Sequence, residues 1–515
     1  MNKPLLLSLA TVALLGSNLN AETMYTKFQA MELDMKKLQH EISALKAEQK
    51  QLKAEALKAQ EEAKEARKAK ESDAEDEDEG SVDERLSDLE ESLTNLNKAT
   101  NGSHLKFNVD YRFAIENMQY KMADGSNVNN DAFMTNRLWL NMNWAATKHL
   151  SFTGQLAYNK AFGARSGANN GAYETFDWIA NENAYDDTLR VRSAYFLYKN
   201  DTFITTDIPW TFSIGRRPST NGHLVNLRDD DHASSPMGHT INVEFDGLSS
   251  KFVLENVTGV EGMYVKFCAG RGLSNAKPRI SSTPYASNKD TTPNIDLAGL
   301  IFVPYDNGQY SLNTQYYYAN NLIDVKNPLD PTQGFKTVGG LHSLTANIVA
   351  NGIGDEISDF LDDTIFFVSG AMSITNPDKN GGGMLGRTEA KTGYSVWTGV
   401  QIPSLISEEG RWGLEYNHGS KFWRSMTYGE DTNIGSKLAA RGDAYEAYFT
   451  EPIIEDALSI QVRYTYIDYA YSGSNGFFGD TTGTPLSMEQ AIANGLGDSV
   501  VDTAQDIRFY IRYRY

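Results

Sequence analysis

The sequence predicts an all-β protein, a transmembrane antiparallel barrel of about sixteen strands that is preceded by an α-helical coiled coil. Two periodicities predict this fold class. From residue 105 to the C-terminus apolar residues alternate with polar ones, whereas before residue 100 they recur at spacings of three and four. The 515 residues include 42 Gly, 27 Tyr and 23 Phe at a mean hydropathy of −0.46. This composition lacks the long apolar runs of a helical membrane bundle.

Residues 1–21 are predicted to be a secretory signal peptide. Lys3 precedes an apolar run from Leu5 to Leu15. The segment SNLNA then ends at Ala21 with the small residues that a signal peptidase site requires. The run is shorter than the ~20 residues that a membrane helix requires. We therefore expect cleavage after Ala21, rather than a retained amphipathic or buried helix.

The next part of the chain has the heptad pattern of a coiled coil. We expect one coiled coil at 22–70, an acidic linker at 71–81 and a short second coiled-coil segment at 82–100. The expected seam consists of Phe28, Met31, Met35, Leu38, Ile42, Leu45 and Leu52. Because one helix cannot bury such a stripe alone, we expect a homo-oligomer, in particular a trimer. The alternative is a single solvated helix supported by Glu–Lys pairs four residues apart.

From residue 105 onward the period is two. In the first segment Phe107, Val109 and Tyr111 share one face, while Asn108 and Asp110 share the other. The predicted strands are 105–116, 133–144, 150–160, 188–199, 210–216, 240–252, 262–271, 294–305, 309–319, 337–352, 364–375, 392–403, 411–423, 441–452, 457–471 and 504–515. Long and short connections mostly alternate along the chain. This alternation is typical of an outer-membrane barrel, which has long outer loops and short periplasmic turns. Fourteen or eighteen strands remain alternatives.

The C-terminus supports the same placement. Phe509, Ile511, Tyr513 and Tyr515 form an apolar stripe that ends on an aromatic residue. Such an exposed row would be unfavourable on the edge strand of a soluble protein. We therefore expect residues 105–515 to lie in the bacterial outer membrane, among lipid and lipopolysaccharide, with the coiled coil in the periplasm.

Four sequence blocks resemble those of an uncharacterised family of porin-like outer-membrane proteins from Gram-negative bacteria. The blocks are FSIGRRPSTNG, RWGLEYNHGSKFW, KLAARGDAYEAYFTEP and GSNGFFG. The resemblance spans most of residues 105–515 and implies the barrel architecture, but it supplies no substrate and no catalytic residues. A signal peptide, a helical extension and a barrel together also resemble trimeric porins.

If the apolar face contacts lipid, the charged face lines the lumen of a barrel wide enough for an aqueous channel. The predicted pore-lining residues are Lys106, Asp110, Arg112, Arg137, Arg190, Arg192, Glu415, Arg463, Arg508, Arg512 and Arg514. The arginines favour a cationic wall that sets ion selectivity. Mutual pairing of these charges in a merely solvated lumen is an equally weighted alternative.

The block LRDDDH places Asp229, Asp230 and Asp231 in the third long connection. Similar porins fold this loop inward as a constriction, in which case the aspartates would face Arg190 and Arg192. An exposed surface loop is slightly favoured over that constriction. A divalent-cation site and an N-cap cluster are weaker alternatives, since the spacing does not match a calcium loop.

Composition and motifs argue against several function classes. The net charge of −20 is unsuited to binding nucleic acid. A single cysteine, Cys268, provides neither a disulfide framework nor a cysteine metal cluster. His418 and Ser420 are the only neighbours suggestive of catalysis, and no phosphate loop, zinc signature or haem motif occurs. We therefore expect no enzyme activity, no metal and no cofactor.

These observations favour a porin, a water-filled channel for passive diffusion of ions and small polar solutes. Two alternatives remain. The barrel could anchor a coiled coil that tethers the outer membrane to the cell wall, or it could act as a surface adhesin.

The coiled coil leads to a first prediction. Charged replacements of Leu38 and Ile42 should weaken self-association of residues 22–100, because apolar knobs at these seam positions provide most of the buried area. Sedimentation of the isolated segment measures the effect. A monomer both with and without the replacements would rule out the predicted assembly.

Overall fold

The computed structural model describes most of the chain beyond residue 104. The described ranges are 105–163, 189–232, 234–276, 279–286, 294–325, 335–354, 357–379, 383–427, 430–473 and 484–515. The predicted signal peptide, coiled coils and acidic linker lie outside the described residues. Residues 102–515 belong to one compact unit.

This unit is built from strands, with four short helices among the described residues. The strands are β1 (Lys106–Met122), β2 (Asn127–Ala145), β3 (Leu150–Ala161), β4 (Arg190–Asn200), β5 (Trp210–Ser219), β6 (Ile241–Val253), β7 (Tyr264–Leu273), β8 (Ile295–Asp306), β9 (Tyr310–Val325), β10 (Phe335–Asn351), β11 (Ile365–Pro377), β12 (Thr392–Pro403), β13 (Arg411–Gly419), β14 (Met426–Thr427), β15 (Gly442–Ile454), β16 (Leu458–Tyr469) and β17 (Val501–Arg514). The helices are α4 (Val225–Asp229), α5 (Glu255–Thr258), α6 (Asp359–Asp362) and α7 (Met488–Ala493).

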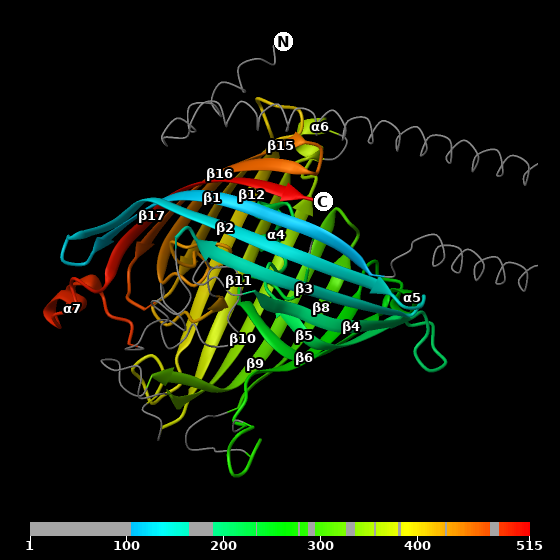
Figure 1. The fold of residues 1–515 in the computed structure, drawn as a ribbon, viewed down its shortest axis with the longest axis horizontal. Helices are drawn as coiled ribbons and strands as arrows, with labels where there is room; N and C mark the ends of the chain where they lie inside the picture. The colour runs from blue at the N-terminus through cyan, green and yellow to red at the C-terminus, as the bar shows by residue number, and fades with distance from the viewer. Residues whose placement is uncertain are drawn as a thin grey trace, which may run out of the picture. The chain divides into compact units, whose positions relative to one another are not determined.

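Sixteen of these strands form a closed antiparallel barrel (Figure 1). Each strand pairs with the next one in the chain, except that β13 pairs directly with β15. The barrel closes where β1 pairs with β17, with Arg112 opposite Arg512. The short strand β14 lies outside this order and pairs in parallel with the start of β6. The prediction of sixteen strands is confirmed, and every predicted segment overlaps one strand of the barrel.

Several strands differ from their predicted bounds. β1 continues to Met122, past the predicted end at residue 116. The prediction stopped early because Gln119 and Lys121, the outward residues of this last part, are polar and break the apolar alternation. β13 instead ends at Gly419 rather than at 423. Trp423 has turned inward, is fully buried and donates from Nε1 to the Leu438 carbonyl at 2.8 Å.

The two faces of the barrel differ in polarity. On β10 the outward Leu344 and Ile348 are 40% and 61% exposed, whereas the inward Ser343 and Asn347 are each 1% exposed. An apolar outer face around a polar interior is the inverse of a soluble barrel and is the arrangement of a transmembrane one. None of the helices in the described part of the chain is both long and apolar enough to span a bilayer.

Leu344 provides a test of the lipid-facing side. Leu344→Arg, near the middle of β10, should destabilise the barrel in lipid vesicles by about 2–4 kcal/mol, because a charge at the bilayer midplane loses its hydration. Leu405→Arg is the matched control, since Leu405 is 77% exposed in the turn between β12 and β13. Urea unfolding in vesicles measures both variants. Equal effects would contradict a membrane-spanning β10.

Candidate functional site

Two long connections fold into the lumen of the barrel. The β5–β6 loop (220–232 and 234–240) contains α4, and the β13–β15 loop (420–427 and 430–441) contains β14. In the first loop the apolar residues Leu224 and Val225 are buried in a cluster with Phe367 and Trp397 of the wall. Leu438 of the second loop belongs to the same cluster, so the two loops pack together.

The β13–β15 loop is held at two further places. Met426 packs with Ile241 and Tyr317 in a cluster formed by the inner faces of β6, β8, β9 and β10. Ile434 packs with Met118 and Ile467 near the ends of β1 and β16. Apolar packing therefore fixes both loops inside the barrel.

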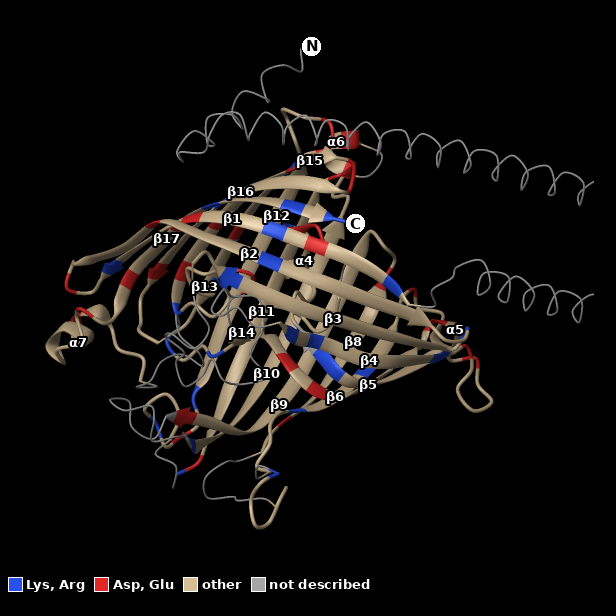
Figure 2. Ribbon diagram, in the orientation of Figure 1, with Lys and Arg blue, Asp and Glu red and all other residues tan. Residues whose placement is uncertain are grey.

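Arginines gather on the inner wall where the barrel closes. The strand register places Arg112 of β1 directly opposite Arg137 of β2 and Arg512 of β17. Four residues earlier on β17, Arg508 is opposite Arg463 of β16. Figure 2 shows basic segments on these neighbouring strands. We call these five residues the arginine row. Like charges directly opposite one another repel, so the row requires anions.

Asp431 of the β13–β15 loop neutralises the centre of the arginine row. Its carboxylate forms an ion pair with Arg112 and lies 3.6 Å from Arg137 and 3.9 Å from Arg508. Its carbonyl accepts hydrogen bonds from Arg463 at 2.9 Å and from Arg508 at 2.6 Å. Burial alone would raise the pKa of the Asp431 carboxyl, but Arg112, with Arg508 and Arg137, holds that pKa well below its usual range.

The β5–β6 loop meets the end of the same row. Arg512 pairs with the Asp231 carboxylate at 2.8 Å and with Asp110 of β1, and it donates to the Asp229 carbonyl at 2.8 Å. Arg514 donates to the carbonyls of Asp229 and Asp230 at 2.9 and 3.0 Å. The preference for an exposed surface loop is therefore wrong: Asp230 is exposed, but Asp229 is only 2% exposed.

The basic partners of these aspartates also differ from the prediction. The ion pairs join them to Arg512 and Arg514 of β17 and to the adjacent Arg228, instead of the expected Arg190 and Arg192 of β4. The chain order of the strands could not indicate this, because the loop crosses the lumen before it reaches the wall.

A second buried charge cluster lies between the loops and the β12–β15 wall. Glu415 accepts hydrogen bonds from the Trp397 indole at 2.8 Å and from the Lys437 ammonium at 2.6 Å. Lys437 also pairs with Glu446, which Arg228 of α4 approaches at 3.3 Å. Each loop thus supplies a cation to carboxylates of the wall.

The remaining predicted pore-lining residues lie in different settings. Arg192 lies 3.5 Å from Glu244 and donates to Gln155 at 2.5 Å. Arg190 is half-buried at the start of β4, and Lys106 is exposed at the start of β1. Within the predicted set, Asp110 pairs with Arg137 and Arg512, but the counter-charge at the centre of the arginine row comes from Asp431, which the prediction did not include.

Several buried residues of the site were missed from the sequence. Asp431, Lys437 and Arg228 form ion pairs with the wall, and His239 lies between the hydroxyls of Ser369 and Ser395 at 2.8 and 2.9 Å. Loops have no periodicity that marks an inward position. The excess of inward arginines over inward carboxylates on β1, β2, β16 and β17 was the one available signal that a loop must supply an anion.

Solvent-accessible cavities flank the β5–β6 loop. One of about 560 Å³ is lined by Arg192, Arg217 and Arg512 together with Asp231. Another of about 460 Å³ lies among the turns at the strand ends, where its lining includes Asp230, Asp363, Glu408, Glu409, Glu455, Asp456 and Arg411. The first cavity is rich in arginine and the second is acidic.

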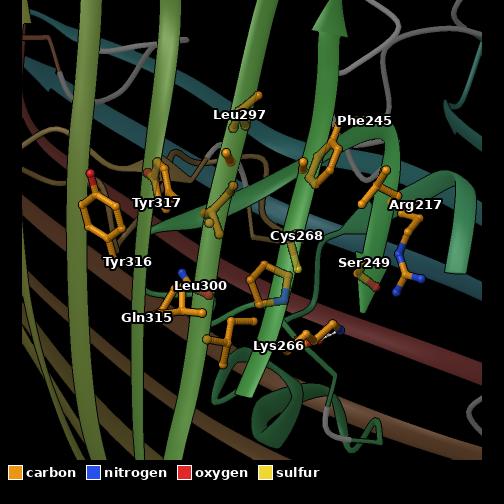
Figure 3. A pocket seen from close by; sticks show the side chains of 18 residues that line it. Arg217, Phe245, Ser249, Lys266, Cys268, Leu297, Leu300, Gln315, Tyr316 and Tyr317 are labelled. Atoms are coloured by element: carbon orange, nitrogen blue, oxygen red, sulfur yellow. Dashed lines mark hydrogen bonds between the residues drawn. The ribbon is translucent and has the colours of Figure 1, made fainter. Parts of the chain in front are cut away.

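A third cavity, of about 50 Å³, is lined by residues of the β5–β6 loop and the wall (Figure 3). Its lining includes Lys266 and Cys268 of β7 beside apolar residues such as Leu297 and Tyr317. Lys266 donates to the Ser235 hydroxyl, which ties the loop to the wall. Within the described ranges no group of three or more His, Cys, Asp or Glu side chains is arranged to hold a metal ion.

The fold and the lumen define a transmembrane β-barrel whose interior is crossed by two loops. The chain belongs to the family described as "Protein of unknown function (DUF3373)", whose model matches residues 127–515. The resemblance to an uncharacterised family is thus confirmed. No curated protein sequence matches the chain.

Solved outer-membrane barrels are similar in fold. The anion-selective porin from Comamonas acidovorans has a TM-score of 0.44 at 10% identity, over 80% of this chain and 99% of that chain. Pseudomonas putida OprB has a TM-score of 0.43 at 13% identity, over 80% and 94%. OmpT, an outer membrane protein of Vibrio cholerae, has a TM-score of 0.42 at 11% identity, over 80% and 97%.

Asp431 provides a test of the charge cluster. Asp431→Asn should destabilise the folded barrel by about 3–5 kcal/mol, because it removes the carboxylate partner of the buried Arg112 guanidinium and one of the partners of Arg137 and Arg508. Asp230→Asn is the matched control, since Asp230 is exposed in the other loop. Urea unfolding in detergent measures both, and a similar small loss in each would contradict the central role of Asp431.

The pH dependence follows from the lowered pKa of Asp431. A carboxyl whose pKa falls on folding contributes stability above its unfolded pKa of about 3.9, and this stability is lost only as the pH drops through the lower folded value. The difference in unfolding free energy between the wild type and Asp431→Asn should therefore stay constant from pH 8 to about pH 5. A change in this difference over that interval would instead place the pKa of Asp431 in the folded protein above about 5, contrary to stabilisation of its carboxylate by the arginine row.

Proposed function

We propose that the protein is an outer-membrane channel of restricted width that conducts ions and small charged solutes. The observation that carries this proposal is the paired charge lining. Arginines of the wall and carboxylates of the two loops face each other inside a barrel whose outer face is apolar. Opposed charges in a narrow aqueous passage select solutes by charge.

The cavities support a solvent-filled route on one side of the β5–β6 loop. Both larger cavities border this loop. The arginine-rich one extends from Arg217, where β5 enters the loop, to Asn143 and Thr153 beside the β2–β3 turn, and the acidic one is lined by the turns at the strand end that carries the short connections. In an outer-membrane barrel this end faces the periplasm. In this proposal the acidic cavity is a periplasmic vestibule, and the arginine-rich cavity lies deeper along the same route.

The remaining parts of the chain fit this location. The predicted signal peptide would direct export, the lipid-facing residues would contact lipid and lipopolysaccharide, and the predicted coiled coil would assemble trimers in the periplasm. These features are proposals that rest on the sequence pattern.

A second candidate function is a closed barrel that anchors the coiled coil and tethers the outer membrane to the cell wall. The observation that favours it is the packing of both loops in the lumen, where Trp423 and His239 are at most 1% exposed. A permanently closed lumen would conduct no ions, so electrical recording separates the two candidates.

Single-channel recording in planar bilayers tests the channel and its selectivity. Under a KCl gradient, joint replacement of Asp229, Asp230 and Asp231 by Asn should shift the reversal potential toward anion preference, because the lumen loses negative charge. Neutralising Asp124, Asp131 and Asp498 is the matched control, since these exposed aspartates lie at the rim.

The salt dependence distinguishes the two locations. A shift caused by charges inside the lumen should persist better between about 0.1 M and 1 M salt than a shift caused by rim charges, which are screened. Equal shifts in both triple variants would remove the β5–β6 loop from the conducting path. Absence of any conductance would favour the tether.

A further inference from the structure

The 560 Å³ cavity beside the β5–β6 loop has the size and the polar lining of a ligand site. Its wall combines strands from distant parts of the chain with the loop itself, so that Trp139 of β2, Arg217 of β5 and Arg512 of β17 share one space with Asn221 and Asp231. Such convergence of polar groups from several elements fixes the orientation of a bound molecule.

One arginine of this cavity has no carboxylate partner within the described residues. Of the three arginines that line it, Arg192 lies 3.5 Å from the buried Glu244 and Arg512 pairs with two aspartates, which leaves Arg217. Arg217 differs, because no described carboxylate pairs with it. It donates to the Ser213 hydroxyl, lies 4.6 Å from the centre of the Tyr195 ring, and also lines the third cavity (Figure 3). Arg217 is therefore the cation available to an anion.

Two buried polar atoms of the lining also have no hydrogen-bond partner within the described residues. They are the indole Nε1–H of Trp139, a donor, and the side-chain Oδ1 of Asn221, an acceptor. Both residues are more than nine-tenths buried, at 4% and 8% exposure. The Trp139 ring is held in place by the guanidinium groups of Arg137 and Arg192, at 3.5 and 4.3 Å from its centroid. A buried donor and a buried acceptor without partners favour a ligand that carries hydroxyl groups.

We propose that this cavity binds a small polyhydroxylated carboxylate, such as a sugar acid, and this inference rests on the proposed channel function for access to the lumen. The carboxylate pairs with Arg217, one hydroxyl accepts from the Trp139 indole, and another donates to the Asn221 oxygen. A single arginine without a carboxylate partner matches a monocarboxylate better than a dianionic phosphate.

Three probes of similar size and different charge test this assignment. Isothermal titration calorimetry of the full-length, detergent-solubilised protein compares D-gluconate, D-glucose and D-glucosamine. Gluconate should bind about tenfold more tightly than glucose, because a hydrogen bond to a charged group adds that much affinity. Glucosamine, which is cationic, should bind more weakly than glucose.

Variants assign the effect to residues. Arg217→Gln should abolish the preference for gluconate over glucose, while Arg217→Lys should retain part of it and show that the fold tolerates substitution there. Trp139→Phe should weaken both probes alike, because it removes a donor without changing the charge. Arg411→Gln is the matched control in the acidic cavity and should change neither affinity.

The outcomes separate this inference from the channel proposal. Equal binding of gluconate and glucose, no binding of either, or an Arg217→Gln variant with the wild-type preference would overturn the site. If the same preparation conducts ions in bilayers, only the ligand assignment is lost. Gluconate binding with the expected preference, in a protein that does not conduct, would sustain the site and refute the channel.

Discussion

Electrostatic neutralisation of the arginine row is the interaction on which the interior of this barrel depends. A β-barrel places neighbouring inward residues side by side, and here that register sets arginine against arginine across β2, β1, β17 and β16. Wall carboxylates such as Asp110 and Glu116 offset part of this charge. The remainder is offset by Asp431, whose carboxylate approaches Arg112, Arg137 and Arg508 together. A buried charge without such a partner would be strongly unfavourable.

This requirement explains why the lumen contains two loops rather than a wide opening. The β13–β15 loop supplies Asp431 to the arginine row and Lys437 to Glu415 and Glu446, so each charge that it brings meets an opposite charge on the wall. The β5–β6 loop supplies Arg228 and Asp231 in the same way. Apolar contacts of Leu438 and Ile434 add packing to these ion pairs. Apolar packing and ion pairs together fix the position of each loop, and apolar burial adds most of the net stabilisation.

The strands could be predicted from the sequence because lipid on one side and polar contacts on the other impose a period of two on every wall segment. Inward residues such as Asp110, Arg112 and Arg137 followed directly from that alternation. Asp431 and His239 did not, because a loop inside the lumen meets a different environment at each residue and leaves no period. The inward fold of Asp229 was considered but not favoured, since three consecutive acids are more often solvated. Burial of Asp229 is favourable because Arg228 pairs with its carboxylate and two arginines of β17 donate to its carbonyl. The sequence alone does not show that β17 lies beside this loop.

The position of Asp431 has a consequence for the order of folding. Its partner Arg112 is 319 residues away in the chain, on the first strand, while Arg508 lies on the last. These two strands become neighbours only when the ends of the sheet meet. Contacts of such long sequence separation form late, because the closure entropy of the intervening chain must first be overcome. Docking of the β13–β15 loop is thereby coupled to completion of the wall, so an unclosed sheet retains an undocked loop and an unneutralised row of arginines.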